Sequence, residues 1–225
     1  MSVFCLVHGS AHSPDCWKLL SAELASRGHE SIAVDLPLGR PEWSASDYAQ
    51  VIAAALRTED AIVVAHSASG LFLPLVLQFA PVGHLIYLAS ILPLPGSSFS
   101  SQVQNDPKTY NPEFLQINPS NFNDAAVQRF LLHDCPPDLL AWAQSTIRLL
   151  YAKQAITEIT PLKEWPQVSS SYISCTDDLT INPAWWEAAA ERRLGIKPIR
   201  MNGGHDPFIS RPGELARILC HVLSR

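Results

Sequence analysis

Short apolar runs alternate with amphipathic stretches along most of the chain. The apolar runs are rich in β-branched residues and fall at 3–7, 31–34, 61–65, 84–88, 170–174 and 197–200. Stretches with helical spacing of apolar residues lie between them, at 17–26, 48–57, 184–193 and 213–223. Strands that are apolar on both faces and are followed by helices are typical of a parallel sheet covered on two sides. The pattern predicts an open, doubly wound α/β fold with a mostly parallel sheet.

Local signals support the ends of these helices. Asn182 followed by Pro183 is a typical helix start, and Gly28 and Gly195 stand where helices are expected to end. Pro74 falls inside the helix expected after residue 70. We expect it either to kink that helix or to remove one hydrogen bond.

The alternation stops between about residues 93 and 166. Turn-rich sequence at 93–98 and 118–121 gives way to expected helices at 124–132 and 137–151. We interpret residues 93–166 as a helical cap inserted between two strands, and residues 1–92 and 167–225 as the two parts of the core. An insertion at the carboxyl edge of such a sheet lies over the ligand site. Its aromatic residues can line an apolar pocket or pack the cap onto the sheet: Phe114, Phe122, Phe130, Trp142, Tyr151 and Trp165.

Composition narrows the class of protein. The 225 residues are 47% hydrophobic and 16% charged, which suffices for one sizeable core and excludes extensive disorder. The net charge is −5 and no basic cluster occurs, so nucleic acid is not an expected partner. The five cysteines are scattered and form no C-x-x-C pair, which indicates neither a disulfide framework nor a zinc site. With no basic region at the N-terminus, we expect a cytoplasmic protein.

A long stretch without charged residues does not change this view. Residues 61–105 contain no Asp, Glu, Lys or Arg, but Pro74, His84 and the polar stretch 66–70 interrupt them. No run approaches the roughly 20 apolar residues of a membrane-spanning helix. The stretch is expected to form the buried centre of a soluble fold.

Residues 61–71 form an apolar strand that runs into a turn of small residues and then a helix. This context matches a nucleophile elbow, in which small residues flank a serine on a sharp turn. Ser67 is the candidate nucleophile, with Ala65 and Ser69 as its small neighbours. The alternative is a helix N-cap serine, a role that Ser69 also fits.

A serine nucleophile needs a histidine base held by a carboxylate. His205 lies in a glycine-rich turn after the last expected strand, and Asp177 and Asp178 end the strand before it. Because the carboxyl ends of parallel strands share one edge, these residues are expected to meet Ser67. The order Ser67, Asp178, His205 fits an α/β-hydrolase, and we favour Asp178 over Asp177. Alternatively, the two aspartates cap a helix and the histidine is a solvated loop residue.

The loop after the first expected strand is the candidate for the remaining part of the site, the oxyanion hole. Backbone N–H groups of this loop and of the residue after the nucleophile form the oxyanion hole in such sites, which nominates Ser10 and Ala68. His8 and His12 stand four residues apart, as zinc ligands do, but the stretch is a loop and lacks the glutamate of H-E-x-x-H. We therefore expect no metal and no cofactor.

These motifs resemble the α/β-hydrolase superfamily over essentially the whole chain. The stretches 8–17, 175–178 and 204–208 are similar to the branch of plant methylesterases, hydroxynitrile lyases and bacterial pyrethroid-hydrolase-like esterases. The resemblance implies the same triad and the same oxyanion donors. Two departures are that Ala65 and Ser69 replace the usual glycines, and that Gly9 and Asp206 stand where the lyases have threonine and lysine.

Three functions follow as hypotheses. The first is a serine esterase that cleaves a small apolar carboxylic ester through an acyl-enzyme. The second is a lyase or cyclase with His205 as the working base, and the third is a non-catalytic binder of a small ligand. The sequence does not fix the substrate or the oligomeric state.

Overall fold

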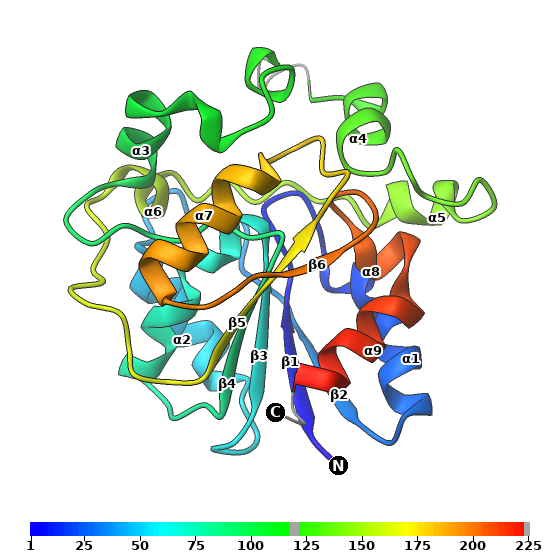
Figure 1. Cartoon of the computed structure of the whole chain (residues 1–225), viewed down its shortest axis with the longest axis horizontal. Coiled ribbons are helices and arrows are strands. Elements are labelled where there is room, and N and C mark those ends of the chain that lie inside the picture. The colour runs from blue at the N-terminus through cyan, green and yellow to red at the C-terminus, as the bar shows by residue number, and fades with distance from the viewer. Residues whose placement is uncertain (118–121, 223–225) are drawn as a thin grey trace.

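The computed structural model of the protein describes residues 1–117 and 122–222 (Figure 1). The turn expected at 118–121 lies outside the described residues. Six strands form one sheet in the order β2-β1-β3-β4-β5-β6, and all neighbours are parallel. The strands are β1 (Val3–Val7), β2 (Glu30–Val34), β3 (Ile62–His66), β4 (His84–Leu88), β5 (Ser170–Cys175) and β6 (Ile199–Met201). The predicted α/β fold class is confirmed.

Helices connect these strands on both sides of the sheet. The α-helices are α1 (Lys18–Ser26), α2 (Ala45–Ala54), α3 (Phe99–Asn105), α4 (Asp124–Phe130), α5 (Leu140–Ser145), α6 (Lys153–Thr157), α7 (Pro183–Leu194), α8 (Pro207–Ser210) and α9 (Pro212–Val222). Short 3₁₀ helices are η1 (Pro14–Trp17), η2 (Ser67–Leu71), η3 (Leu73–Gln78), η4 (Pro107–Thr109) and η5 (Phe114–Gln116). Figure 1 shows α1, α8 and α9 on one side of the sheet and α2 and α7 on the other.

The ends of two helices, α2 and α7, are capped by local side-chain and backbone contacts. The Ser44 hydroxyl accepts a hydrogen bond from the Asp47 N–H, and the Asp47 carboxylate accepts one from the Ser44 N–H. This reciprocal pair satisfies two N–H groups that a helix start leaves free, so α2 begins earlier than the apolar pattern predicts. Asn182 caps α7 through the N–H of Trp185, and Gly195 ends it at φ +68°. Both ends of α7 agree with the sequence signals.

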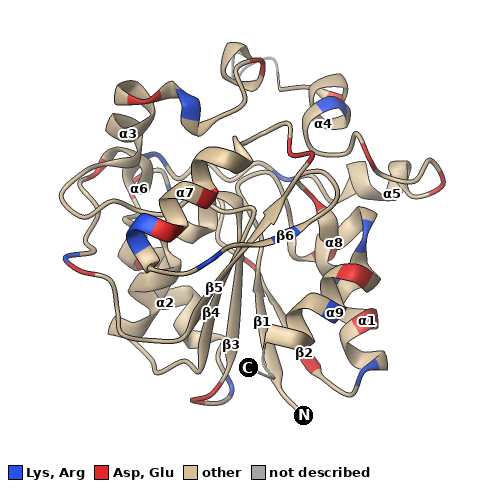
Figure 2. Ribbon diagram, viewed as in Figure 1, with Lys and Arg blue, Asp and Glu red and all other residues tan. Residues whose placement is uncertain are grey.

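The central strands contain only uncharged residues, as Figure 2 shows by their colour. β3 is buried along its whole length, and β1 and β4 along all but their first residue. The edge strands β2 and β6 are the exceptions to the expected two-sided burial, because only the last residue of each is buried. No helix among the described residues is long and apolar enough to cross a membrane. The charge-free stretch forms the centre of the sheet and the elbow.

The segment between β4 and β5 carries α3, α4, α5 and α6, which Figure 1 shows mainly beyond the carboxyl edge of the sheet. Two of these helices, α3 and α6, were not predicted. The helix expected at 137–151 is shorter, because only Leu140–Ser145 is helical. The division of the chain at residues 92 and 166 stays a prediction.

The helix expected after the elbow is replaced by two 3₁₀ stretches. η2 ends at Leu71 and η3 begins at Leu73, with Pro74 at its second position. Proline has no N–H to donate and fits the first turn of a helix, so the break falls just before it. The structure therefore differs from both effects expected of Pro74, a kink or the loss of one hydrogen bond, because two 3₁₀ helices separated at Phe72 replace the single helix.

The elbow is packed closely against the chain that follows β4. A β-carbon on Gly70 would lie 2.1 Å from the Ile91 carbonyl oxygen and 2.2 Å from the Ser90 Oγ. The Ile91 N–H and the Ser90 hydroxyl both donate hydrogen bonds to the Ser67 carbonyl, at 3.0 and 2.8 Å. Since backbone cannot yield as a flexible side chain does, only glycine fits at position 70.

We expect Gly70→Ala to lower the free energy of unfolding by about 3 kcal/mol, because the added methyl group overlaps backbone atoms. Urea denaturation followed by tryptophan fluorescence measures the change. Gly213→Ala in α9 is the matched control, since its β-carbon would meet nothing closer than 3.5 Å. The control should equal or slightly exceed the wild type, because alanine favours helix. Equal stability of both variants would contradict this account.

Candidate active site

Ser67 sits at the end of β3 in a conformation that few non-glycine residues adopt. Its φ is +54°, and the chain enters η2 at this residue. A β-carbon on Gly9 would lie 2.9 Å from the Ser67 Cβ, so the loop after β1 reaches the elbow only because residue 9 is glycine. The Ser69 hydroxyl donates to the His8 carbonyl and joins the same two loops. The turn is thus held from both sides, as a strained nucleophile elbow requires.

The three residues selected from the sequence lie in one hydrogen-bonded line. The His205 Nε2 is 3.0 Å from the Ser67 Oγ, and the His205 Nδ1 is 2.7 Å from the Asp178 Oδ2. Because the carboxylate can only accept, the Nδ1 carries a proton and the Nε2 is free to accept one from Ser67. The Asp178 Oδ1 accepts the N–H groups of Thr180 and Ile181, at 2.7 and 3.0 Å. All three side chains are buried.

Burial and charge act in opposite directions on His205. Burial lowers the pKa of this imidazole, whereas the charge and hydrogen bond of Asp178 and the charge of Asp206 raise it. The pKa of His205 is raised overall. The arrangement therefore favours the imidazolium that forms when the ring takes up a proton.

The two adjacent aspartates have different contacts. The Asp177 carboxylate accepts the N–H of Gly203 at 3.0 Å and the hydroxyl of Thr176, and its hydrogen bonds in the described part of the chain do not include the His205 ring. Asp178 alone of the pair reaches that ring. The geometry thus agrees with the preference for Asp178 and gives Asp177 a role in holding the histidine loop.

The loop after β1 borders the same space. Ser10 lines the cavity beside Ser67, and Ala68 directly follows Ser67 at the start of η2. The carbonyls of Ser10 and Ala11 accept the N–H groups of Leu150 and Arg148, at 2.7 and 3.2 Å. These bonds tie the loop to the segment between β4 and β5. Sequence reasoning missed this docking, because it joins residues more than 130 positions apart.

A cavity of about 340 Å³ opens onto Ser67 and His205. Its other described lining residues are Gly9, Ser10, Ala11, His12, His66, Phe114, Ile117, Phe122, Leu131, Leu149, Leu150, Tyr151 and Thr180. None of them is Asp, Glu, Lys or Arg. The volume falls in the range of small-molecule sites, and the apolar walls suit an uncharged ligand.

Only half of the aromatic residues proposed for the pocket line it. Phe114, Phe122 and Tyr151 do, whereas the other three contribute to packing. The Phe130 ring lies edge-on against Phe114 at 5.4 Å, and Trp165 lies against Tyr87 at 6.2 Å. Trp142 is partly buried against the core. The larger aliphatic residues of the wall carried no distinctive signal in the sequence: Ile117, Leu131, Leu149 and Leu150.

His8 and His12 do not form a pair. The His8 Nε2 accepts the N–H of Leu36 at 3.2 Å, so its Nδ1 carries the proton and donates to the Gly9 carbonyl at 2.8 Å. Burial lowers the pKa of His8 to about 4, which keeps the ring neutral. His8 thus fastens the loop after β1 to the segment after β2.

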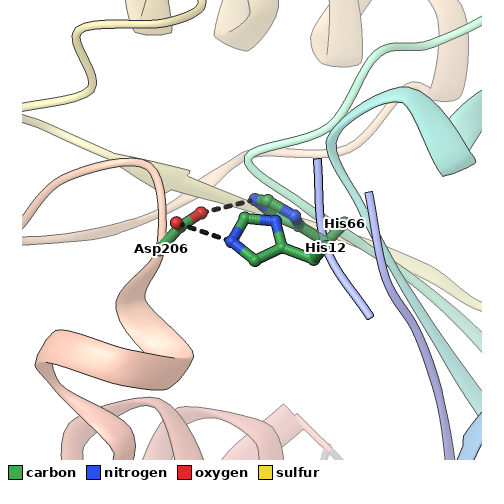
Figure 3. A group of neighbouring side chains, drawn as sticks. All are labelled: His12, His66 and Asp206. Carbon is green, nitrogen blue, oxygen red and sulfur yellow. Dashed lines mark ion pairs between the residues drawn. The ribbon is translucent and has the colours of Figure 1, made fainter. Parts of the chain in front are cut away.

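His12 instead belongs to a buried group with His66 and Asp206, shown in Figure 3. The nearest polar atoms of these three side chains all lie within 4.8 Å of one another. The His66 Nε2 donates to the His205 carbonyl at 3.0 Å, and a nitrogen that carries this proton cannot also bind a metal. Within the group, the contacts are ion-pair distances from the Asp206 carboxylate to the Nε2 atoms of His12 and His66, at 3.0 and 3.7 Å. The sequence offered one signal for it, since His66 and Asp206 directly flank Ser67 and His205.

Fold, elbow and loop order together define an α/β-hydrolase. Residues 6–218 match the family described as the alpha/beta hydrolase family, and the chain belongs to it.

Several curated proteins resemble the chain over nearly its whole length. The alpha/beta hydrolase nvfD of Aspergillus novofumigatus is 26% identical and is matched over 95% of this chain and 93% of its own. Methyl jasmonate esterase 1 of Vitis vinifera is 24% identical, with 98% and 96% covered. Norfluorocurarine synthase 2 of Strychnos nux-vomica is 23% identical, with 99% and 96% covered.

Solved structures show the same fold. The methylesterase MES16 from Arabidopsis superposes with a TM-score of 0.79 at 19% identity, covering 100% of this chain and 99% of that one. The pyrethroid hydrolase PytH superposes with a TM-score of 0.77 at 18% identity, covering 99% and 97%.

The positive φ of Ser67 predicts an unusual effect on stability. We expect Ser67→Gly to raise the free energy of unfolding by about 1 kcal/mol relative to Ser67→Ala, because glycine adopts this conformation without the steric penalty of a β-carbon. Both variants remove the hydroxyl, so the comparison isolates the backbone. Thermal and urea unfolding of the two proteins measure the difference. A less stable Ser67→Gly protein would show that the elbow is not strained.

Proposed function

We propose that the protein is a serine esterase that cleaves a small, apolar carboxylic ester through an acyl-enzyme. The observation that carries this proposal is the line from Asp178 through His205 to Ser67, with contacts of 2.7 and 3.0 Å at the mouth of the cavity. Two esterases among the proteins of similar sequence and fold, methyl jasmonate esterase 1 and MES16, support the reaction class.

The proposed reaction has two halves, formation of the acyl-enzyme and its hydrolysis. In each half His205 acts first as a base and then as an acid. His205 takes the proton of Ser67 as the Ser67 Oγ attacks the ester carbonyl carbon, and the N–H groups of Ser10 and Ala68 stabilise the negative oxygen that results. His205 then gives its proton to the leaving alcohol, and the carbonyl re-forms as an acyl-serine. Water, deprotonated by His205, attacks this intermediate, and His205 then returns the proton to the Ser67 Oγ as its bond to the acyl carbon breaks and the acid is released. Asp178 holds the ring in the required tautomer throughout.

The cavity supports the choice of an apolar ester. A charged substrate would have to leave water for walls that offer no opposite charge among the described lining residues, which is costly. Methyl and other short esters of an apolar acid fit a space of about 340 Å³. The substrate is proposed to be a small molecule, with no cofactor.

Treatment with a small fluorophosphonate should add one covalent group to the wild type and none to Ser67→Ala, because only a serine activated by His205 attacks phosphorus. Intact-mass spectrometry measures the adduct without knowledge of the natural substrate. Ser69→Ala is the matched control, since Ser69 lies in the same turn but faces the His8 carbonyl. We expect this control to keep the adduct. An adduct that persists in Ser67→Ala would contradict the assignment.

The two adjacent aspartates should differ sharply in their effect on turnover. We expect Asp178→Asn to lower kcat for p-nitrophenyl esters by about 10⁴-fold, because the amide no longer fixes the His205 tautomer or offsets its charge. Asp177→Asn keeps an oxygen for the Gly203 N–H and should lose far less. Steady-state kinetics of both variants measure the contrast. Equal losses would mean that the carboxylates only hold the loop.

A second candidate is a lyase or cyclase that uses His205 as its base without an acyl-enzyme. The similarity to norfluorocurarine synthase 2 favours keeping it, because a protein of like length and sequence carries a name other than esterase. Turnover of the Ser67→Ala variant distinguishes the two candidate functions. This variant loses all esterase turnover, whereas a reaction driven only by His205 retains part of its rate.

A further inference from the structure

A second carboxylate lies behind the proposed catalytic histidine. Asp206 is 1% exposed, and neither of its oxygens has a conventional hydrogen-bond partner among the described residues. Its Oδ2 is 3.0 Å from the His12 Nε2 and its Oδ1 is 3.7 Å from the His66 Nε2 (Figure 3). A buried carboxylate without compensation is costly, so these two imidazoles are the groups that make its burial tolerable.

The three side chains come from the three segments that build the site, two loops and the end of β3. His12 lies two residues after Ser10, His66 directly precedes Ser67, and Asp206 directly follows His205. Figure 3 shows both imidazoles directed at the carboxylate from separate segments of the chain. Any shift of one loop relative to the others therefore changes a contact in this group. The contacts of this group therefore fix the positions of the oxyanion loop, the nucleophile and the base relative to one another.

The protonation of His66 is fixed by its partner. The His205 carbonyl can only accept, so the His66 Nε2, at 3.0 Å, must be the donor. Burial and the neighbouring imidazoles of His205 and His12 lower the pKa of His66 well below its ordinary value. His66 is thus a neutral ring that holds the backbone of His205 through one N–H group.

We propose that Asp206 is a positioning residue for His205. Held by His12, and lying 3.7 Å from the Nε2 of His66, it fixes the loop that carries the base, and its negative charge stabilises the imidazolium formed when His205 takes up a proton. The catalytic role of His205 rests on the proposed function, whereas the effect of Asp206 on the protonation of the ring does not.

Few other charged or titratable groups face the His205 ring or the loop that carries it. The Asp178 carboxylate faces the His205 Nδ1, Ser67 faces the Nε2, and the neutral His66 ring packs against the His205 ring with centroids 4.6 Å apart. Two further carboxylates support the loop through its backbone, Asp177 at Gly203 and Asp134 at Gly204. The charges that raise the pKa of His205 are those of Asp178 and Asp206.

The test is the protonation of His205 in wild type and Asp206→Asn, followed by NMR of ring nitrogens in protein with labelled histidine. Removing the charge destabilises the imidazolium, so we expect the midpoint of the His205 titration to fall by about one pH unit. Asp134→Asn is the matched control, because its amide oxygen can still accept the Gly204 N–H. Its midpoint should equal that of the wild type. A midpoint unchanged in Asp206→Asn would overturn the proposal.

Kinetics give the consequence for turnover. Because His205 must be neutral to accept the proton of Ser67, kcat/KM of the wild type should fall as the pH drops through a value above about 6.5. In Asp206→Asn this acid limb should move to lower pH while the limiting kcat drops about tenfold, with KM little changed. Absence of esterase turnover in the wild type would refute the proposed function, and the NMR titration would still decide the role of Asp206.

A further readout needs no variant at position 206. In the wild type we expect the His66 ring to stay neutral between pH 5 and pH 9, with its proton on Nε2. A proton on Nδ1 instead would remove the bond to the His205 carbonyl and overturn the proposal. Stoichiometric zinc in the purified protein would overturn it as well, because a metal would then occupy the space between these side chains.

Discussion

The site depends on the close approach of backbone at the carboxyl edge of the sheet, where β1 and β3 lie side by side. After β1 the chain continues to one edge of the sheet, and after β3 it continues to the other. Such a point of reversal in the strand order is where open α/β sheets bind ligands. Ser67 is presented there only because Gly9 allows the first loop to touch it and Gly70 allows the segment after β4 to pass beneath it. Hydrogen bonds from Ser90 and Ile91 to the Ser67 carbonyl hold the strained turn from below. Ser67 is thus placed by packing of the backbone, and its strained conformation is tolerated because its neighbours hold it in place.

Electrostatics in the interior follow from the same packing. Four imidazoles lie buried near the elbow, and hydrogen bonds determine what three of them, His8, His66 and His205, can do. His8 and His66 are neutral rings that brace loops, since their carbonyl and N–H partners fix their tautomers. His205 differs because a carboxylate faces its Nδ1, and this charge is what suits it to carry a proton. The neighbours of each histidine therefore decide whether it braces a loop, as His8 and His66 do, or is suited to take up a proton, as His205 is.

The segment between β4 and β5 supplies one wall of the cavity. Its contribution to the cavity is mostly aromatic and aliphatic, while the polar groups come from loops of the sheet. The backbone bonds from Leu150 and Arg148 to the loop after β1 connect the two, so the wall of the cavity and the oxyanion loop are parts of one structure. Chemistry and specificity are therefore built from separate segments of the chain that meet at a single edge, as is usual in open α/β sheets.

The sequence by itself determined the fold class and singled out Ser67, Asp178 and His205, because alternating apolar runs fix a parallel sheet and residues after its strands share one edge. It also determined the ends of α7, where Asn182 and Gly195 act locally. Only the tertiary structure decided the break at Phe72, the shorter α5 and which aromatic residues line the cavity, since those depend on contacts between distant segments. The group around Asp206 is the clearest case: His66 and Asp206 directly adjoin Ser67 and His205 in the sequence, but no spacing reveals that three segments bring the group together, because its contacts exist only after the sheet has aligned those segments.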